Sequence, residues 1–236
     1  MQRRRSNRTQ FILALVFATL VGLGLFAYGA WRDHSLEYDY LIWNLFLAWL
    51  PLAFAVRLIH ILRRKLWSSW EGLTWTVLWL AFLPNSFYMI SDFIHIQDVP
   101  SANVLYDVFM FTSFIYTGVV LGFSSLYLIH LKLRQRLPTR LADFCVGLTL
   151  FICSVGVYIG RDLRWNSWNL LTNPGGLLFD IADRLEHPSA YPQMILAIVS
   201  FFVLLVIMYG LLWRGIRLVR QPLNGKVPVV PEQRGD

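Results

Sequence analysis

Long apolar segments separated by short polar ones occupy most of the chain. A membrane-spanning helix needs about 20 apolar residues, and six segments have this length or come close to it. They cover residues 11–31, 40–62, 73–91, 104–130, 141–160 and 193–213. Their apolar residues run continuously instead of alternating with polar ones, which argues against β-strands. The pattern therefore predicts an all-α, polytopic membrane helix bundle of about six transmembrane helices.

The first apolar segment follows a basic start, MQRRRSNRTQ, and could be mistaken for a secretory signal peptide. Its apolar run of about 20 residues is longer than the apolar region of most such signals, and no clear cleavage site of small residues follows it. We therefore interpret residues 11–31 as the first transmembrane span.

Composition supports the membrane assignment. The chain of 236 residues is 56% hydrophobic and 15% charged, whereas soluble domains carry roughly a quarter charged residues. A water-soluble fold of this composition would have too little polar surface. The excess of basic over acidic residues, 21 against 14, would also suit a nucleic-acid-binding protein. The positions of the basic residues favour a different explanation.

The basic residues gather on one side of the predicted membrane. If the N-terminus lies inside, the inner segments hold sixteen of them and the outer segments four, with Arg57 at the inner end of its span. The inner set is Arg3, Arg4, Arg5, Arg8, Arg63, Arg64, Lys65, Lys132, Arg134, Arg136, Arg140, Arg214, Arg217, Arg220, Lys226 and Arg234. Because positive charge marks cytoplasmic loops, we expect both termini in the cytoplasm of a bacterium, with the protein in its plasma (inner) membrane.

This charge distribution also limits the partners. The inner basic clusters are expected to face the anionic headgroups of membrane lipids, and no nucleic acid is needed to explain them. We expect three parts: a basic cytoplasmic N-terminus, a six-span transmembrane domain, and a basic tail whose proline-rich, polar sequence predicts disorder. These parts cover residues 1–10, 11–213 and 214–236.

One segment near the end of the third span, FLPNSFYMISDFIH, carries polar residues at helical spacing. Asn85, Tyr88, Asp92 and His95 follow one another at steps of three, four and three, which places them on one face of an α-helix. An aspartate at membrane depth costs a few kcal/mol or more. This face is therefore predicted to line the protein interior or a water-filled cavity.

Other polar residues occur at the same predicted level of the membrane. They lie at the outer ends of the second, fourth and fifth spans and in the loop that follows, and are Asn44, Asp107, Arg161, Arg164 and Asn166. Such a set covers acid–base chemistry and anion binding. We assign Asp92, His95 and Asp107 as candidate catalytic residues. The candidate substrate-binding residues are Asn44, Asn85, Tyr88, Arg161, Arg164 and Asn166.

Two alternatives to a catalytic site follow from the same residues. Asp92 and Asp107 could pair with Arg161 and Arg164 only to fix how the helices meet. Asp92 and His95 also offer two metal ligands on one face, but the chain has no established zinc spacing. We predict neither a metal nor a cofactor.

Small residues and prolines indicate how the spans pack. Gly118 and Gly122 lie on one face of the fourth span, a pattern that allows close helix approach. Pro51 and Pro84 interrupt the second and third spans and are expected to kink them, because each removes a backbone donor. In the outer segment, LLFDIADRLEH has an apolar face and predicts a short amphipathic helix on the membrane interface.

Three strings of the sequence resemble a known family. They are WNLFLAWLPLAFA, WLAFLPNSFYMISDFIHI and GVYIGRDLRWNSWNLL, at residues 43–55, 79–96 and 156–171. They resemble an uncharacterised family of bacterial multi-span membrane proteins, domain-of-unknown-function family thirteen-sixty-one, over most of residues 40–215. The family pattern implies Asn44, Pro84, Asn85, Tyr88, Asp92, His95, Asp107, Gly160, Arg161, Arg164, Trp165, Asn166 and Trp168.

The chain departs from that pattern at three places. It has Ser86 and Phe87 where the pattern has Ala-Pro, Ser91 where it has Thr, and Asn169 where it has Asp. The last change argues against any role that needs a carboxylate there. The family carries no known activity, so the resemblance implies a membrane fold and a polar cluster but no particular reaction.

Three functions are compatible with these features. The first is an enzyme or binding site for an anionic or lipid-linked substrate at the outer face, with the arginines holding the anion and Asp92 or His95 as general base. The second is a non-catalytic assembly or scaffold protein. The third, a small-solute transporter, ranks lower because transporters place ionisable groups near the midplane, which lacks them here.

Overall fold

The computed structural model of the protein describes residues 2–98, 104–162, 172–186 and 191–220. Its elements are α1 (Gln2–Asp33), α2 (Tyr40–Ile61), α3 (Trp70–Tyr88), the 3-10 helix η1 (Met89–Asp98), α4 (Val104–Arg134), α5 (Thr139–Asp162), α7 (Pro174–Glu186) and α8 (Pro192–Arg220). Six of these helices are long and apolar enough to cross a membrane. The predicted all-α, multi-span fold is therefore confirmed.

The first and last helices run past the predicted ends of their apolar segments. α1 begins at Gln2 and α8 continues to Arg220, so both include the basic residues that flank the membrane. Arginine is a good helix former, and nothing in these flanks forces the helix to stop where the apolar run stops. The proposed division at residues 10 and 213 remains a prediction about charge and topology.

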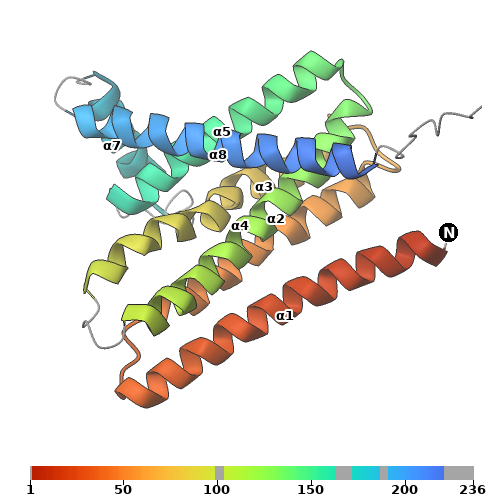
Figure 1. Ribbon diagram of the computed structural model, residues 1–236. Coiled ribbons are helices and arrows are strands. Elements are labelled where there is room, and N and C mark those ends of the chain that lie inside the picture. The colour runs from red at the N-terminus through yellow and green to blue at the C-terminus, as the bar shows by residue number, and fades with distance from the viewer. Residues whose placement is uncertain (1, 99–103, 163–171, 187–190, 221–236) are drawn as a thin grey trace, which may run out of the picture.

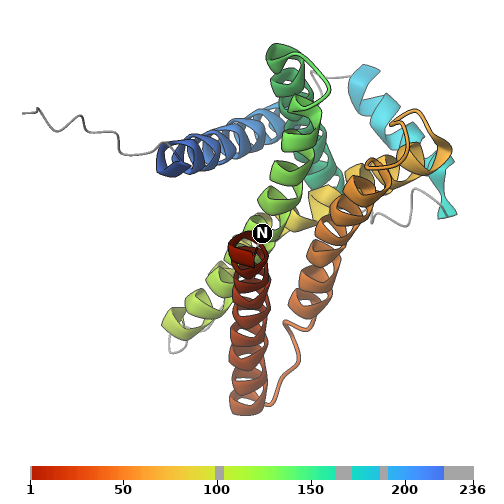
Figure 2. The same cartoon turned by 90° about the vertical axis from the view of Figure 1, so that its right-hand side faces the viewer.

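Helices α2, α3 and α4 form the centre of the bundle. α2 packs against both α3 and α4, whereas α1 contacts α4, and α8 contacts mainly α5. In Figure 1, α1 lies on one side of this centre, and α5 and α8 lie on the other (Figures 1 and 2). Half of the apolar stretch of α4 is buried within the protein, against 17% for α1 and 11% for α8. The exposed apolar faces of α1 and α8 thus form much of the surface available to lipid.

The α3–α4 interface depends on the two glycines of α4. A Cβ added at Gly118 would lie 2.5 Å from the Met89 sulfur, and one added at Gly122 would lie 2.8 Å from the Ser86 Cβ. Any larger residue would therefore push the two helices apart. Trp79 of α3 crosses the same interface and donates its indole hydrogen to the Ser125 hydroxyl at 3.2 Å. The close approach predicted for this face is confirmed.

The two prolines lie inside continuous helices and at helix–helix contacts. The Pro84 ring approaches α5 so closely that a Cβ at Gly156 would lie 2.8 Å from it. In the turn before Pro51, the Ala48 carbonyl accepts a hydrogen bond from the buried Ser86 hydroxyl at 3.1 Å. This bond joins α3 to α2 in the turn that contains the proline.

The loop helix expected from the sequence is present as α7. A hydrogen bond from the Tyr191 hydroxyl to the Asp183 carboxylate, 3.0 Å long, ties α7 to the start of α8. The apolar side chains on which the interfacial prediction rested, Leu177, Leu178, Ile181 and Leu185, lie outside the described residues. The placement of α7 on the membrane interface stays a prediction.

The bundle has two chemically different ends. At one end, the Arg136 guanidinium donates to the Leu62 carbonyl at 2.9 Å, which joins the basic connections after α2 and α4. We call this the basic end. At the other end, the Asp92 carboxylate meets Asn44 at the start of α2 and Arg161 at the close of α5. We call this the acidic end, and the candidate functional residues lie there.

Candidate functional site

The carboxylate of Asp92 is held between two other helices. Its side chain is only 1% exposed, in η1 at the acidic end of the bundle. One carboxylate oxygen accepts a hydrogen bond from the Asn44 side-chain amide of α2 at 3.3 Å. The other lies 4.0 Å from a guanidinium nitrogen of Arg161 in α5, which is an ion-pair distance without a direct hydrogen bond. Three segments far apart in sequence thus meet at one buried charge.

The local structure around Asp92 differs from the predicted α-helix. α3 ends at Tyr88, and the chain continues as 3-10 helix from Met89 to Asp98. A 3-10 helix has about three residues per turn, so an offset of four no longer returns to the same side. The prediction that one α-helical face carries the whole stripe from residue 85 to 95 was therefore wrong. The change of helix type turns Asp92 towards α2 and α5.

Asn85 and Tyr88, which come before Asp92 in the stripe, have different surroundings. The Asn85 side-chain amide donates to the Phe82 carbonyl of its own helix at 3.1 Å. Tyr88 is half-buried and packs against the hydrophobic core. The roles of Asn85 and Tyr88 as binding residues therefore stay predictions.

The structure adds Tyr40 to this group, a residue that sequence reasoning missed. Tyr40 is the first residue of α2, and its half-buried side chain lies at the acidic end of the bundle. Its position four residues before Asn44 places both on one helix face, a spacing that the sequence offered as a signal. We call Tyr40, Asn44, Asp92 and Arg161 the Asp92 site.

Asp107 belongs to a second cluster. In the structural alternative, Asp107 would pair with Arg161 or Arg164, but its ionic partner is Arg32 of α1, at 3.7 Å. Arg32 also donates two hydrogen bonds to its neighbour Asp33, at 2.7 and 2.5 Å, and its guanidinium lies 4.6 Å from the centre of the Tyr106 ring. The partner was missed because Arg32 ends the first span, far in sequence from Asp107 at the start of α4.

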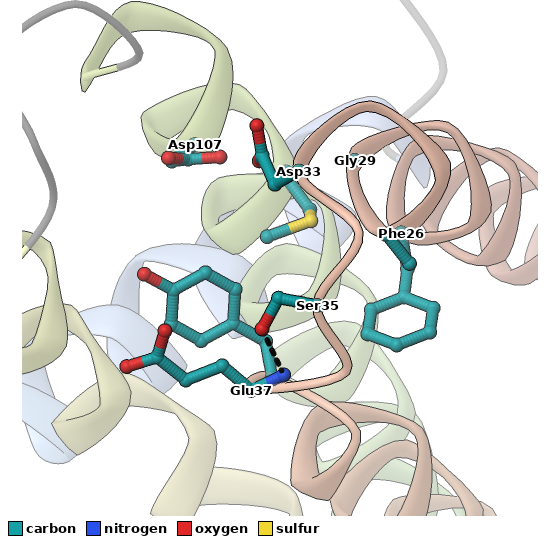
Figure 3. A pocket seen from close by; sticks show the side chains of 9 residues that line it. Phe26, Gly29, Asp33, Ser35, Glu37 and Asp107 are labelled. Atoms are coloured by element: carbon teal, nitrogen blue, oxygen red, sulfur yellow. Dashed lines mark hydrogen bonds between the residues drawn. The ribbon is translucent and has the colours of Figure 1, made fainter.

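A cavity of about 290 Å³ opens beside Asp107. It lies between α1, the connection to α2, and the start of α4 (Figure 3). Three of its lining side chains are carboxylates, those of Asp33, Glu37 and Asp107. Tyr38 also lines it, and the Tyr38 ring lies 6.4 Å from that of Tyr40. The cavity and the Asp92 site are therefore neighbours that share an aromatic wall.

Three of the predicted site residues cannot be placed by their side chains. His95 falls in η1, but its side chain lies outside the described residues, as do Arg164 and Asn166 altogether. Their roles stay predictions. Among the described residues, no group of three or more His, Cys, Asp or Glu side chains has the arrangement of a metal site.

The fold and the site define the class of protein: a helical membrane protein with six spans and a buried carboxylate at one end of the bundle. The sequence profile of the family described as Protein of unknown function (DUF1361) matches residues 43–208, from the start of α2 into α8, and the chain belongs to this family. The match includes Asn44, Asp92 and Arg161, whereas α1 with Arg32 lies before it. No curated protein and no solved structure matches the chain.

Proposed function

We propose that the Asp92 site binds, and acts on, an anionic or lipid-linked substrate at the acidic end of the bundle. The observation that carries this proposal is a carboxylate with 1% exposure that lies beside an arginine and an amide from two other helices. Charge buried within a membrane protein is costly and usually serves binding or transfer. Arg161 holds the anionic group of the substrate, and Asp92 accepts a proton from the substrate or from water.

The order of exposure supports these roles. The Arg161 side chain is 25% exposed, whereas that of Asp92 is almost fully covered. An incoming phosphate or carboxylate therefore meets the guanidinium first and comes to rest in front of the Asp92 carboxylate. Because guanidinium groups recognise such anions through two parallel hydrogen bonds, Arg161 would orient the substrate as well as attract it.

The remaining candidates take supporting roles in this proposal. His95 follows Asp92 by three residues, and Arg164 and Asn166 follow Arg161 within five, and we propose that all three act together with the Asp92 site. Asn44 fixes the carboxylate through its amide hydrogen bond. Asp107 has its ionic contact with Arg32, and it contributes to the negative charge of the adjacent cavity.

A second candidate function is a scaffold in which the site only ties helices together. One observation favours it: the contacts of Asp92 connect η1 with α2 and α5, which are far apart in sequence. In that case Asp92 and Arg161 would matter for stability and not for any ligand. The two functions make opposite predictions for neutral, shape-conserving substitutions.

The test measures ligand binding and stability in the same variants. Purified full-length protein in detergent is titrated with a polyprenyl phosphate, with the neutral polyprenol and inorganic phosphate as comparison ligands. We expect Arg161→Gln to weaken polyprenyl phosphate binding about tenfold, the weight of one hydrogen bond between charged groups. Arg32→Gln is the matched control, since it removes an arginine from the same end that pairs with Asp107.

The readouts separate the two functions. If Asp92→Asn and Arg161→Gln lower the unfolding temperature while polyprenyl phosphate binding per folded molecule stays unchanged, the scaffold function is correct. If Arg32→Gln weakens binding as much as Arg161→Gln, the ligand is attracted by the overall electrostatic field of the acidic end and is not bound by the Asp92 site. Binding lost in Arg161→Gln alone, with normal folding, supports the proposal.

A further inference from the structure

Another polar cluster, centred on the buried His130 ring, lies at the basic end of the bundle. The His130 ring of α4 is buried and has one nitrogen 2.9 Å from the Tyr209 hydroxyl of α8. Its other nitrogen lies 2.8 Å from a carboxylate oxygen of Asp143 in α5. No sequence pattern indicated this contact, because the partners of His130 are 13 and 79 residues away. One imidazole thus joins three helices at the end opposite the Asp92 site.

This cluster fixes the positions of an arginine and a tryptophan. The Arg134 guanidinium donates to both carboxylate oxygens of Asp143, at 2.8 and 2.7 Å. The Trp213 ring stacks on the His130 ring with a centroid distance of 4.0 Å and an angle of 22° between the planes. The Arg134 guanidinium also lies 5.0 Å from the centre of the Trp213 ring. The Trp213 ring is therefore held by the buried His130 ring, and the Arg134 guanidinium by the exposed Asp143 carboxylate.

A groove of about 140 Å³ opens on the outer side of this arrangement, between α4 and α8. It is lined by Tyr127, Leu131, Arg134, Trp213, Ile216 and Arg217. Arg217 is exposed and lies 4.9 Å from the Trp213 ring, so two guanidinium groups flank one indole. The volume corresponds to about four or five water molecules at about 30 Å³ each, which suits a small anionic headgroup rather than a large ligand.

The groove is positively charged. The charge of Arg134 is balanced by Asp143, whereas within the described part of the chain no carboxylate lies at ion-pair distance from Arg217. The remaining walls are aromatic rings and aliphatic side chains. A ligand that fits must therefore carry negative charge at one end and apolar groups beside it.

The position of the groove indicates where such a ligand comes from. It lies near the end of α8, one of the six helices able to span a membrane and the least buried of them. Trp213, Arg214 and Arg217 follow the apolar run of α8, as aromatic and basic residues do at the headgroup level.

We propose that this groove binds an anionic phospholipid of the surrounding bilayer. The lipid phosphate lies between the Arg217 and Arg134 guanidinium groups, over the edge of Trp213, and the start of an acyl chain follows Leu131 and Ile216. The cluster of His130, Asp143 and Tyr209 positions the groove by holding Arg134 and Trp213 in place. This lipid site is separate from the Asp92 site and does not depend on the function proposed for it.

The test compares two arginines one turn apart on α8. Full-length protein in neutral detergent is mixed with phosphatidylglycerol, and bound lipid is counted by native mass spectrometry. Arg217→Gln is expected to reduce retention about tenfold, the loss of one hydrogen bond between charged groups. Arg214→Gln is the matched control, because Arg214 is exposed, carries the same charge and does not line the groove. Arg217→Lys keeps the charge and should retain most of the binding.

Each comparison can overturn the proposal. Equal losses in Arg214→Gln and Arg217→Gln would mean that general surface charge retains the lipid. Equal retention of phosphatidylcholine and phosphatidylglycerol by the unmodified protein would remove the role of negative charge. Binding of soluble glycerol 3-phosphate as tightly as phosphatidylglycerol would replace the membrane lipid by a free phosphate compound. Selective loss of phosphatidylglycerol in Arg217→Gln supports the lipid site.

Discussion

At the scale of single residues, buried polar side chains connect helices that are far apart in sequence. Among the described residues, the buried titratable groups with polar or ionic partners on other helices include Asp92, Asp107 and His130. Each lies at or near one end of a helix, and each has a partner from at least one other helix. Such contacts specify which helices meet, because a buried charge without its partner is costly. Chemistry and packing therefore depend on the same side chains.

The buried Ser86 offers a clean test of one such contact. Its hydroxyl donates to the Ala48 carbonyl across the α2–α3 interface, and Ser86→Ala removes that bond while keeping the Cβ. We expect the free energy of unfolding, measured by reversible denaturation in mixed micelles, to fall by about 1 kcal/mol. Ser154→Ala is the control, since its buried hydroxyl bonds only the Leu150 carbonyl of its own helix. Equal losses in both variants would contradict the interhelical role.

The Arg32–Asp107 contact predicts a rescue by a second substitution. Arg32→Gln leaves the buried Asp107 carboxylate without its cation, so we expect a lower unfolding temperature. Adding Asp107→Asn removes the uncompensated charge and should restore most of the loss. Adding Asp33→Asn instead should restore little, because Asp33 is exposed to solvent. Unfolding temperatures in detergent are compared for the unmodified protein, Arg32→Gln and the two double variants. Rescue by added Asp33→Asn but not by added Asp107→Asn would contradict the prediction.

Some of these residues could be predicted from the sequence, and others could not. Asn44, Asp92 and Arg161 could be grouped because all three fall at the same predicted level of the membrane, and the structure brings them together. Arg32 and His130 were missed because their partners come from helices whose rotation about the axis no sequence pattern reveals. The depth of a residue in the membrane can be predicted from the apolar runs, whereas the rotation of each helix towards its neighbours depends on packing.

At the scale of elements, the α3–α4 interface shows how small residues determine helix distance. Gly118 and Gly122 could be identified from their spacing alone, because close approach requires the absence of a side chain. The end of α3 could not, because the sequence MISDFIHI continues a pattern that an α-helix would also satisfy. In the structure the chain changes to 3-10 helix at Met89, in the segment whose Asp92 contacts α2 and α5.

Gly122 provides the prediction for this interface. Gly122→Ala places a Cβ 2.8 Å from Ser86 and 3.0 Å from the Phe87 ring. We expect a loss of about 1–3 kcal/mol in the free energy of unfolding, because overpacking forces backbones apart. Gly147→Ala is the control: a Cβ there meets nothing within 4 Å, and alanine favours the helix by up to about 1 kcal/mol. A stable Gly122→Ala protein would contradict the close approach, and reversible unfolding in micelles measures both variants.

At the scale of the whole molecule, the two ends differ in charge and in what they could bind. The acidic end contains Asp92, Asp107 and the cavity lined by carboxylates. The basic end contains Arg134, Arg136 and Arg217, together with the groove of aromatic and aliphatic walls. Six helices of the described chain are long enough to span the membrane, and we predict that all six cross it, which would bring the two chain ends to one side. That side follows from the positive charge.

The orientation in the membrane can be decided with two matched leucines. Leu36 and Leu66 are both exposed, at 68% and 72%, and lie in the connections after α1 and α2, at opposite ends of the bundle. In a chain with Cys145→Ala and Cys153→Ala, single cysteines at these positions are treated with a membrane-impermeant maleimide. Because basic segments are retained in the cytoplasm, intact cells should label Leu36→Cys and not Leu66→Cys, and inverted vesicles should show the reverse. The opposite pattern would place the Asp92 site in the cytoplasmic leaflet, where its substrate would have to come from inside the cell.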